Sequence, residues 1–224
     1  MAGAMRSKPT GTTKSRIGIL GTGRVARALT TGLVRAGHQV QLGSRQPEKA
    51  HADEADFPRG VPIQTHRGAV EFGDVVIFAV PFAAVQDVVA TVGPKAFAGK
   101  TVIDATNAPY ESALGRSTSA AEEIAKIVPA AHVVKAFNTM FARHMATGKL
   151  GDEKLLSLVA GDEQTAKEHA LALARDIGFD AVDAGPLSSA RYLEAMAIQN
   201  MTLAFRLKMG TGIGFKLVRE EALI

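Results

Sequence analysis

Three small residues, Gly21, Gly23 and Ala26, occur with the spacing G-x-G-x-x-A directly after the apolar run 16–20. In this pattern the first glycine forms a tight turn, the second lets the backbone approach a pyrophosphate, and the small third residue lets a helix pack closely on a strand. The helix that follows would direct free N–H groups and a partial positive charge at phosphate oxygens. Because the pattern lies between a predicted strand and a predicted helix, it favours a dinucleotide site over a merely structural turn.

A serine and an arginine, Ser44 and Arg45, follow the second predicted strand, about twenty residues beyond the glycines, where NAD-binding proteins carry an acidic residue for the ribose 2′-hydroxyl. A carboxylate there would repel a 2′-phosphate. A hydroxyl and a planar guanidinium instead match phosphate oxygens, and Lys49 adds a positive charge one helical turn later. The pair therefore predicts NADP and not NAD; the alternative is that Arg45 is a solvated surface residue.

Three loops, 79–85, 104–110 and 135–144, follow later predicted strands. Ligands of open parallel sheets bind outside the carboxyl ends of the strands, so we expect these loops around the nicotinamide. The candidate residues are Val80 and Pro81 beside the nicotinamide ribose, Thr106, Asn107, Asn138 and Thr139 for polar contacts, and Met140, Phe141 and Phe82 as an apolar surface for a flat ring. For the last three, ordinary core packing is an equal alternative.

The sequence offers no convincing acid–base pair and no metal site. Its six histidines are scattered without metal-ligand spacing, and no serine stands in a nucleophile elbow. Lys135 is the ionisable residue nearest to the expected crevice, either as a structural residue or as a general acid. Hydride transfer between two cofactor-like rings needs stacking, orientation and exclusion of water more than a proton relay, so it is the chemistry that this pattern favours.

The elements that must position these residues alternate between strand and helix. Short apolar runs predict strands at 16–20, 38–44, 74–80, 100–107 and 131–139, with helices between them. This order is typical of an α/β protein with a Rossmann-type, doubly wound and mostly parallel sheet. We expect a disordered leader at 1–15, an NADP-binding Rossmann domain at 16–150, and at 151–224 a small C-terminal α/β lobe that ends in a long helix, roughly 188–208.

The amino-acid composition argues against nucleic acids and membranes as partners and against cysteine chemistry. The 224 residues are 46% hydrophobic and 21% charged, with a net charge of +4 and no run of Lys or Arg that would form a nucleic-acid stripe. The chain has no cysteine, which excludes disulfides and thiolate chemistry and favours a cytoplasmic location. The most apolar stretch, 74–92, is interrupted by Pro81 and Asp87, so we expect no membrane partner.

Several segments together resemble the NADPH-dependent oxidoreductases of coenzyme F420, an 8-hydroxy-5-deazaflavin. They are IGILGTGRVARAL, GHQVQLGSRQPEKA, KAFNTM, DAGPLSSARYLEAMA and MGTGIGFKLV, from about Arg16 to the C-terminus. The resemblance implies a Rossmann domain with a small C-terminal lobe, often as a dimer. It implies that NADP binds Thr22, Gly23, Arg24, Val25, Ser44, Arg45 and Lys49, and that the deazaflavin lies near Asn138, Met140, Leu207, Met209 and Gly210.

The segment KAFNT departs from archaeal members, which have a histidine there, and resembles a bacterial branch and the reductase domain of a flavin-using membrane metalloreductase family. The hydride acceptor is therefore F420 or a flavin. Reduction of a small imine or ketone, with Lys135 as the acid, and a non-catalytic NADPH sensor are the other hypotheses. The apolar residues of the closing helix (Leu193, Met196, Ala197, Met201, Leu203, Ala204 and Leu207) favour a homodimer over simple packing on the Rossmann domain.

Overall fold

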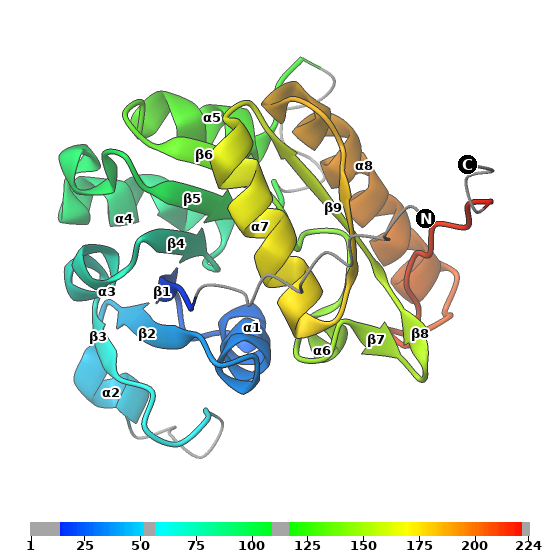
Figure 1. Cartoon of the computed structure of the whole chain (residues 1–224), viewed down its shortest axis with the longest axis horizontal. Helices are drawn as coiled ribbons and strands as arrows, with labels where there is room; N and C mark the ends of the chain where they lie inside the picture. Colours follow the sequence, from blue (N-terminus) through cyan, green and yellow to red (C-terminus); the bar gives the residue numbers. More distant parts are fainter. Residues whose placement is uncertain (1–13, 52–56, 109–116, 221–224) are drawn as a thin grey trace, which may run out of the picture.

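The computed structural model describes residues 14–51, 57–108 and 117–220. An eight-stranded sheet crosses the molecule in the order β10-β9-β6-β5-β4-β1-β2-β3 (Figure 1). The strands are β1 (Arg16–Leu20), β2 (Gln39–Ser44), β3 (Ile63–Thr65), β4 (Val75–Phe78), β5 (Thr101–Asp104), β6 (His132–Lys135), β9 (Leu156–Gly161) and β10 (Asp180–Asp183). Neighbours pair in parallel except β6 and β9, which are antiparallel.

Helices cover both faces of this sheet (Figure 1). One face carries α1 (Arg24–Arg35), α6 (Ala142–Met145) and α7 (Gln164–Ile177); the other carries α3 (His66–Phe72), α4 (Val85–Val92) and α5 (Ala120–Ile127). The short α2 (Pro47–His51) follows β2, and α8 (Ala190–Met201) continues into a π-helix, η5 (Thr202–Arg206). The described residues also contain short 3₁₀ turns and a small hairpin. The turns are η2 (Phe82–Ala84), η3 (Pro94–Phe97) and η4 (Leu187–Ser189), and the hairpin consists of β7 (Lys149–Leu150) and β8 (Glu153–Lys154).

The strands have apolar residues on both sides because both faces of the sheet are covered. Ile17 and Ile19 of β1 belong to the core beneath α1 and α7, whereas Leu20 belongs to the core beneath α3, α4 and α5. β4 alternates in the same way, with Ile77 on the first side and Phe78 on the second. This is why these strands are nearly continuous apolar runs in the sequence. The predicted doubly wound Rossmann-type fold and its long C-terminal helix are confirmed.

The C-terminal part of the chain extends the same sheet. β9 pairs with β6, β10 pairs with β9, and α7 packs on both of these strands and on α1. The domain boundary expected at residue 150 stays a prediction. The leader expected at 1–15 lies outside the described residues apart from Lys14 and Ser15. No helix among the described ranges is long and apolar enough to cross a membrane.

Candidate functional site

The turn between β1 and α1 combines a constrained glycine with an open one. Gly21 has φ +121°, its N–H donates to the carbonyl of Gly43 at 2.9 Å, and a Cβ on it would lie 2.6 Å from the carbonyl oxygen of Ala79. Gly23 is the N-cap of α1 without a capping side chain, and a Cβ on it would meet no atom within 4 Å. The amino end of α1 therefore opens onto free space, which is the arrangement that binds a pyrophosphate.

A cavity of about 610 Å³, here called the β2 cavity, lies outside the carboxyl ends of β1, β2 and β4. It brings together the predicted residues Gly21, Thr22, Gly23, Ser44, Arg45, Lys49, Val80 and Pro81, and adds Gly43, Gln46, Ala50, His66 and Ala79. Arg45 and Lys49 are exposed at its rim, and no carboxylate is among the described residues that line it. The Ser44 hydroxyl oxygen accepts a hydrogen bond from the Gln46 N–H at 3.1 Å, which fixes the turn after β2.

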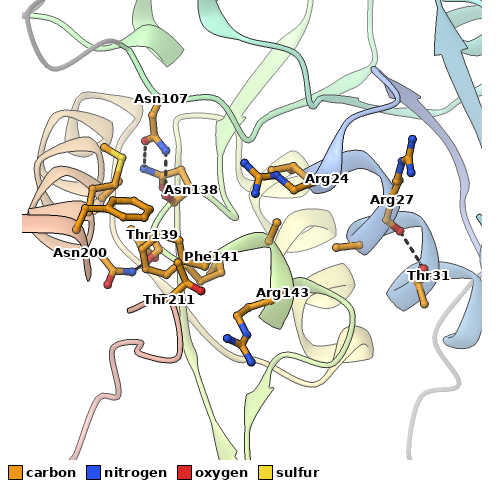
Figure 2. Close-up of a pocket in the computed structure, with 17 residues that line it drawn as sticks. Arg24, Arg27, Thr31, Asn107, Asn138, Thr139, Phe141, Arg143, Asn200 and Thr211 are labelled. Atoms are coloured by element: carbon orange, nitrogen blue, oxygen red, sulfur yellow. Dashed lines mark hydrogen bonds between the residues drawn. The ribbon is translucent and has the colours of Figure 1, made fainter. Parts of the chain in front are cut away.

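A second cavity of about 660 Å³, here called the α1–α8 cavity, opens between these two helices and the loop after β6 (Figure 2). It brings together the predicted residues Arg24, Val25, Asn107, Asn138, Thr139, Met140 and Phe141. It adds Arg27, Ala28, Thr31, Ala142, Arg143, Ala197, Asn200, Met201, Phe205 and Thr211, most of which the sequence had not singled out. Gly23 lines the first cavity and Arg24 the second, so both cavities border the amino end of α1.

Interlocking amides hold the polar wall of the α1–α8 cavity (Figure 2). The Asn107 amide donates to the Asn138 carbonyl at 3.1 Å, and the Asn138 amide donates to Asn107 Oδ1 and to the Leu193 carbonyl, each at 3.0 Å. The preceding residue, Phe137, has φ +61°, a conformation that costs about 1–3 kcal/mol and persists where the surroundings enforce it. Asn138 Oδ1 is buried without a hydrogen-bond partner in the described structure.

Apolar side chains form another part of the lining. Phe141 and Phe205 meet edge to face, with ring centroids 5.8 Å apart and planes at 85°. Met140 lines the same cavity and is buried, whereas Phe205 is 63% exposed. Such a half-open aromatic shelf suits a flat conjugated ring. Phe82, which the sequence also suggested for this surface, instead borders a smaller cavity between α4 and α5.

Positively charged side chains lie at the mouth of the α1–α8 cavity. Arg143 lines it, and Figure 2 shows the Arg24 side chain extending from α1 toward the Asn138 side. Arg27 also lines the cavity, and its Nε donates to the Thr22 carbonyl at 3.1 Å. Two other cations of the C-terminal part are engaged elsewhere: Arg191 pairs with Glu122, whose pKa it lowers, and Lys216 pairs with Glu153.

Four predicted residues lie outside both cavities. Thr106 is 4% exposed, and its backbone holds Lys135 and Asp104. Leu207 and Met209 are largely exposed beyond η5, and Gly210 follows them with its N–H bonded to the Ala204 carbonyl. The neighbouring Phe205 and Thr211 line the α1–α8 cavity in their place. The binding roles assigned to these four residues stay predictions.

Lys135 is fully buried, and its ammonium group makes three hydrogen bonds. It donates to Asp104 Oδ2 at 2.8 Å, to the Thr106 carbonyl at 2.7 Å and to Glu194 Oε1 at 2.7 Å. Glu194, on α8, also accepts the Ala120 N–H at the start of α5. An ammonium has three N–H donors, so none is left for a substrate. Lys135 also lines neither cavity, which supports its structural role.

Comparisons with known proteins show the family to which the chain belongs. The sequence profile of the family described as "NADP oxidoreductase coenzyme F420-dependent" matches residues 16–108. The F420-dependent NADP reductase of Methanothermobacter marburgensis is 34% identical over 203 residues, which cover 80% of this chain and 88% of the relative. The chain belongs to this family of NADP oxidoreductases. The resemblance noted in the sequence is confirmed.

Other relatives differ in what they reduce. Metalloreductase STEAP3 of Rattus norvegicus is 34% identical over 184 residues, which cover 82% of this chain but only 36% of that protein, so the chain spans about a third of its length. A crystal structure of a candidate F420-dependent NADP reductase from Arthrobacter sp. FB24 has a TM-score of 0.81 and 24% identity, covering 92% of this chain and all of that one. A reductive aminase from Aspergillus terreus has a TM-score of 0.64 and 21% identity, covering 87% and 63%. The two structures support the fold alone.

Replacing Lys135 by methionine tests its role. The Lys135→Met variant would leave Asp104 and Glu194 buried without their cation, so we expect its free energy of unfolding to fall by about 3–5 kcal/mol in urea denaturation. Lys126→Met, which removes an exposed ion pair to Glu123, is the control and should cost about 1 kcal/mol or less. A Lys135→Met variant as stable as the wild type but unable to turn over substrate would instead make Lys135 an acid.

Proposed function

We propose that this protein transfers a hydride between NADP(H) and the deazaflavin coenzyme F420. The observation that carries the proposal is that two cavities border the amino end of α1: a positively charged one beside β2 and an apolar one edged by arginines beside α8. A dinucleotide that passes the amino end of α1 would lie with its 2′-phosphate in the first cavity and its nicotinamide toward the second. The ring of the hydride acceptor would then lie on the aromatic shelf of Phe141 and Phe205, within reach of the nicotinamide.

The residues present fit NADP. Ser44, Arg45 and Lys49 would hold the 2′-phosphate, since no carboxylate among the described lining residues repels it. The open space at Gly23 and the uncapped first turn of α1 would take the pyrophosphate. Asn138, which lines the α1–α8 cavity, would contact the nicotinamide carboxamide. Thr22, Arg24, Val25, Val80, Pro81 and Asn107 complete the proposed nucleotide contacts.

The α1–α8 cavity fits a ring acceptor that needs no proton relay from the protein. Met140, Phe141 and Phe205 would hold the ring flat, and Asn138 and Thr139 would orient it against the nicotinamide. No carboxylate or histidine is among the described residues that line this cavity. The hydride leaves C4 of NADPH and adds to C5 of the deazaflavin, while a solvent proton neutralises the reduced ring; the reverse direction uses the same geometry. Arg24 and Arg143 would attract the acidic tail of F420.

A flavin is the second candidate acceptor. The observation that favours it is the similarity to a metalloreductase, together with the KAFNT segment that builds the polar wall. An isoalloxazine ring would fit the same shelf. Imine or ketone reduction with Lys135 as the acid loses its support, because all three N–H donors of this residue are occupied by buried acceptors. A non-catalytic NADPH sensor is disfavoured because the aromatic shelf would serve no purpose in it.

A homodimer and a cytoplasmic location belong to the same proposal. Beyond α8, Phe205, Leu207 and Met209 are 63%, 63% and 58% exposed. These neighbouring apolar side chains would be covered if two copies packed together, which burial of apolar surface favours. A dimeric mass by light scattering at micromolar concentration is the expected result, and a monomeric mass at that concentration would contradict the dimer.

Arg45 should decide the choice between NADPH and NADH. A hydrogen bond to a charged group contributes about 1.5–3 kcal/mol, so Arg45→Ala should weaken NADPH binding about ten- to a hundredfold, and Arg45→Glu should weaken it further. NADH binding should change by less than about threefold in Arg45→Ala. Dissociation constants from fluorescence titration check this, with Arg175→Glu, a change of an exposed arginine on α7, as the control. Equal affinities of the wild type for the two cofactors would refute the NADP assignment.

Spectrophotometric assays with NADPH and one acceptor at a time test the reaction. We expect turnover of F420, and an Arg143→Gln variant should raise the KM for F420 several-fold while leaving the KM for the tail-free deazaflavin ring unchanged. Arg175→Gln should alter neither value. Turnover of FMN or FAD without any of F420 would make the protein a flavin reductase. Tight NADPH binding with no oxidation by any ring acceptor would favour the sensor.

A further inference from the structure

His66 lies in the β2 cavity beside the groups proposed for the 2′-phosphate. It is the first residue of α3, directly after the N-cap Thr65, whose side chain accepts the Gly68 N–H at 3.1 Å. Its side chain lines the cavity together with Ser44, Arg45 and Lys49. The residue is only 6% exposed, so the imidazole forms part of the cavity wall.

The ring of His66 is buried, and one of its two nitrogens lacks a hydrogen-bond partner among the described residues. Its Nδ1 has no hydrogen-bond partner in the described structure. A Cβ at Gly43 would lie 2.9 Å from this nitrogen and 3.0 Å from a methyl group of Leu20, so the glycine makes room for the imidazole. A buried polar atom without a partner is costly, so the Nδ1 of this cavity-lining residue calls for an explanation.

The electrostatic surroundings of His66 favour the neutral imidazole when the cavity holds no ligand. Burial, and then the neighbouring Arg45 guanidinium, lower the pKa of His66. The charged groups on elements that pack against α3 are Arg16 on β1, Asp87 on α4 and Lys95 on η3, and none of them shifts this pKa. On α3 itself, Arg67 pairs with Glu71 and donates to the Thr91 carbonyl. A phosphate dianion bound beside Arg45 would supply the missing opposite charge.

We propose that His66 is a further recognition group for the 2′-phosphate of NADP and that it takes up a proton when this phosphate binds. The inference rests on the proposed placement of NADP in the β2 cavity. NAD, which has a hydroxyl in place of the phosphate, would bind without this proton. His66 would thereby make the preference for NADP depend on pH.

The sign of the pH dependence follows from linkage. The pKa of His66 is lowered in the free protein and would be raised in the complex, so binding takes up a proton at any pH between the two values. In that window the affinity for NADP strengthens as the pH falls, by at most about tenfold per pH unit. Protonation of a phosphate monoester near pH 6 acts in the opposite direction, so the comparison is made between pH 8 and pH 6.5.

Calorimetric titration in two buffers of different ionisation enthalpy measures the proton directly. At pH 6.5 the wild type should take up a fraction of a proton on binding NADP⁺ and none on binding NAD⁺. In His66→Asn the uptake should vanish, and the affinity for NADP⁺ should fall about three- to tenfold while that for NAD⁺ changes less than twofold. His132→Asn, which alters an exposed histidine on β6, should behave as the wild type.

The outcomes separate this inference from the proposed function. A wild type that prefers NADP⁺ but takes up no proton, or a His66→Asn variant with unchanged uptake, would overturn the role of His66 alone. A wild type with no preference for NADP⁺ would overturn the NADP site itself. If His66→Asn does not fold, the imidazole is titrated by NMR in the wild type. Its pKa must then rise with NADP⁺ and not with NAD⁺.

Discussion

The buried ion network around Lys135 is the constraint on which the α1–α8 cavity depends. Asp104 and Lys135 are register partners at the carboxyl ends of β5 and β6, and Glu194 brings α8 onto the same ammonium group. Buried charges are costly unless every partner is present, so the network favours the arrangement of β5, β6 and α8 that keeps all three groups in contact. The chain continues from Lys135 through the strained Phe137 to Asn138, which bonds to the Leu193 carbonyl on α8. The polar wall of the α1–α8 cavity is therefore fixed by charges that never touch a ligand.

Most residues that line the β2 cavity could be predicted from the sequence, because each lies at or near the end of a predicted strand. Gly21 and Arg45 directly follow β1 and β2, Ser44 ends β2, and Gly23 precedes α1, while the parallel pairing of β1 with β2 places the carboxyl ends of these strands at one edge. His66 was missed because β3 is only three residues long and gives no clear alternating pattern. The signal that could have found it is its position, since it starts the helix that follows a strand next to β2.

The lining of the α1–α8 cavity could be predicted only in part, because the packing of α8 and η5 determines which of their side chains reach it. Asn200 and Phe205 reach the cavity from α8 and η5, and Asn200 is held by the Thr139 carbonyl, 61 residues away in the chain. The π-helix matters here as well. Its wider turn, seen in the bond from the Leu207 N–H to the Thr202 carbonyl, changes which side chains share a face. This offers a reason why Phe205 lines the cavity while Leu207 and Met209, expected from the resemblance, are exposed.

The two cavities also differ in how many of their lining residues fall within the part of the chain that matches the family profile. Residues 16–108, which match the family profile, include every residue that lines the β2 cavity but only Arg24, Val25, Arg27, Ala28, Thr31 and Asn107 of the α1–α8 cavity. The shelf and the cation that would meet the acceptor, Met140, Phe141, Phe205 and Arg143, all lie beyond the match. Under the proposed function, selection of the acceptor would therefore depend on the loop after β6 and the end of α8, where Asn138 bonds to the Leu193 carbonyl close to the Lys135 network.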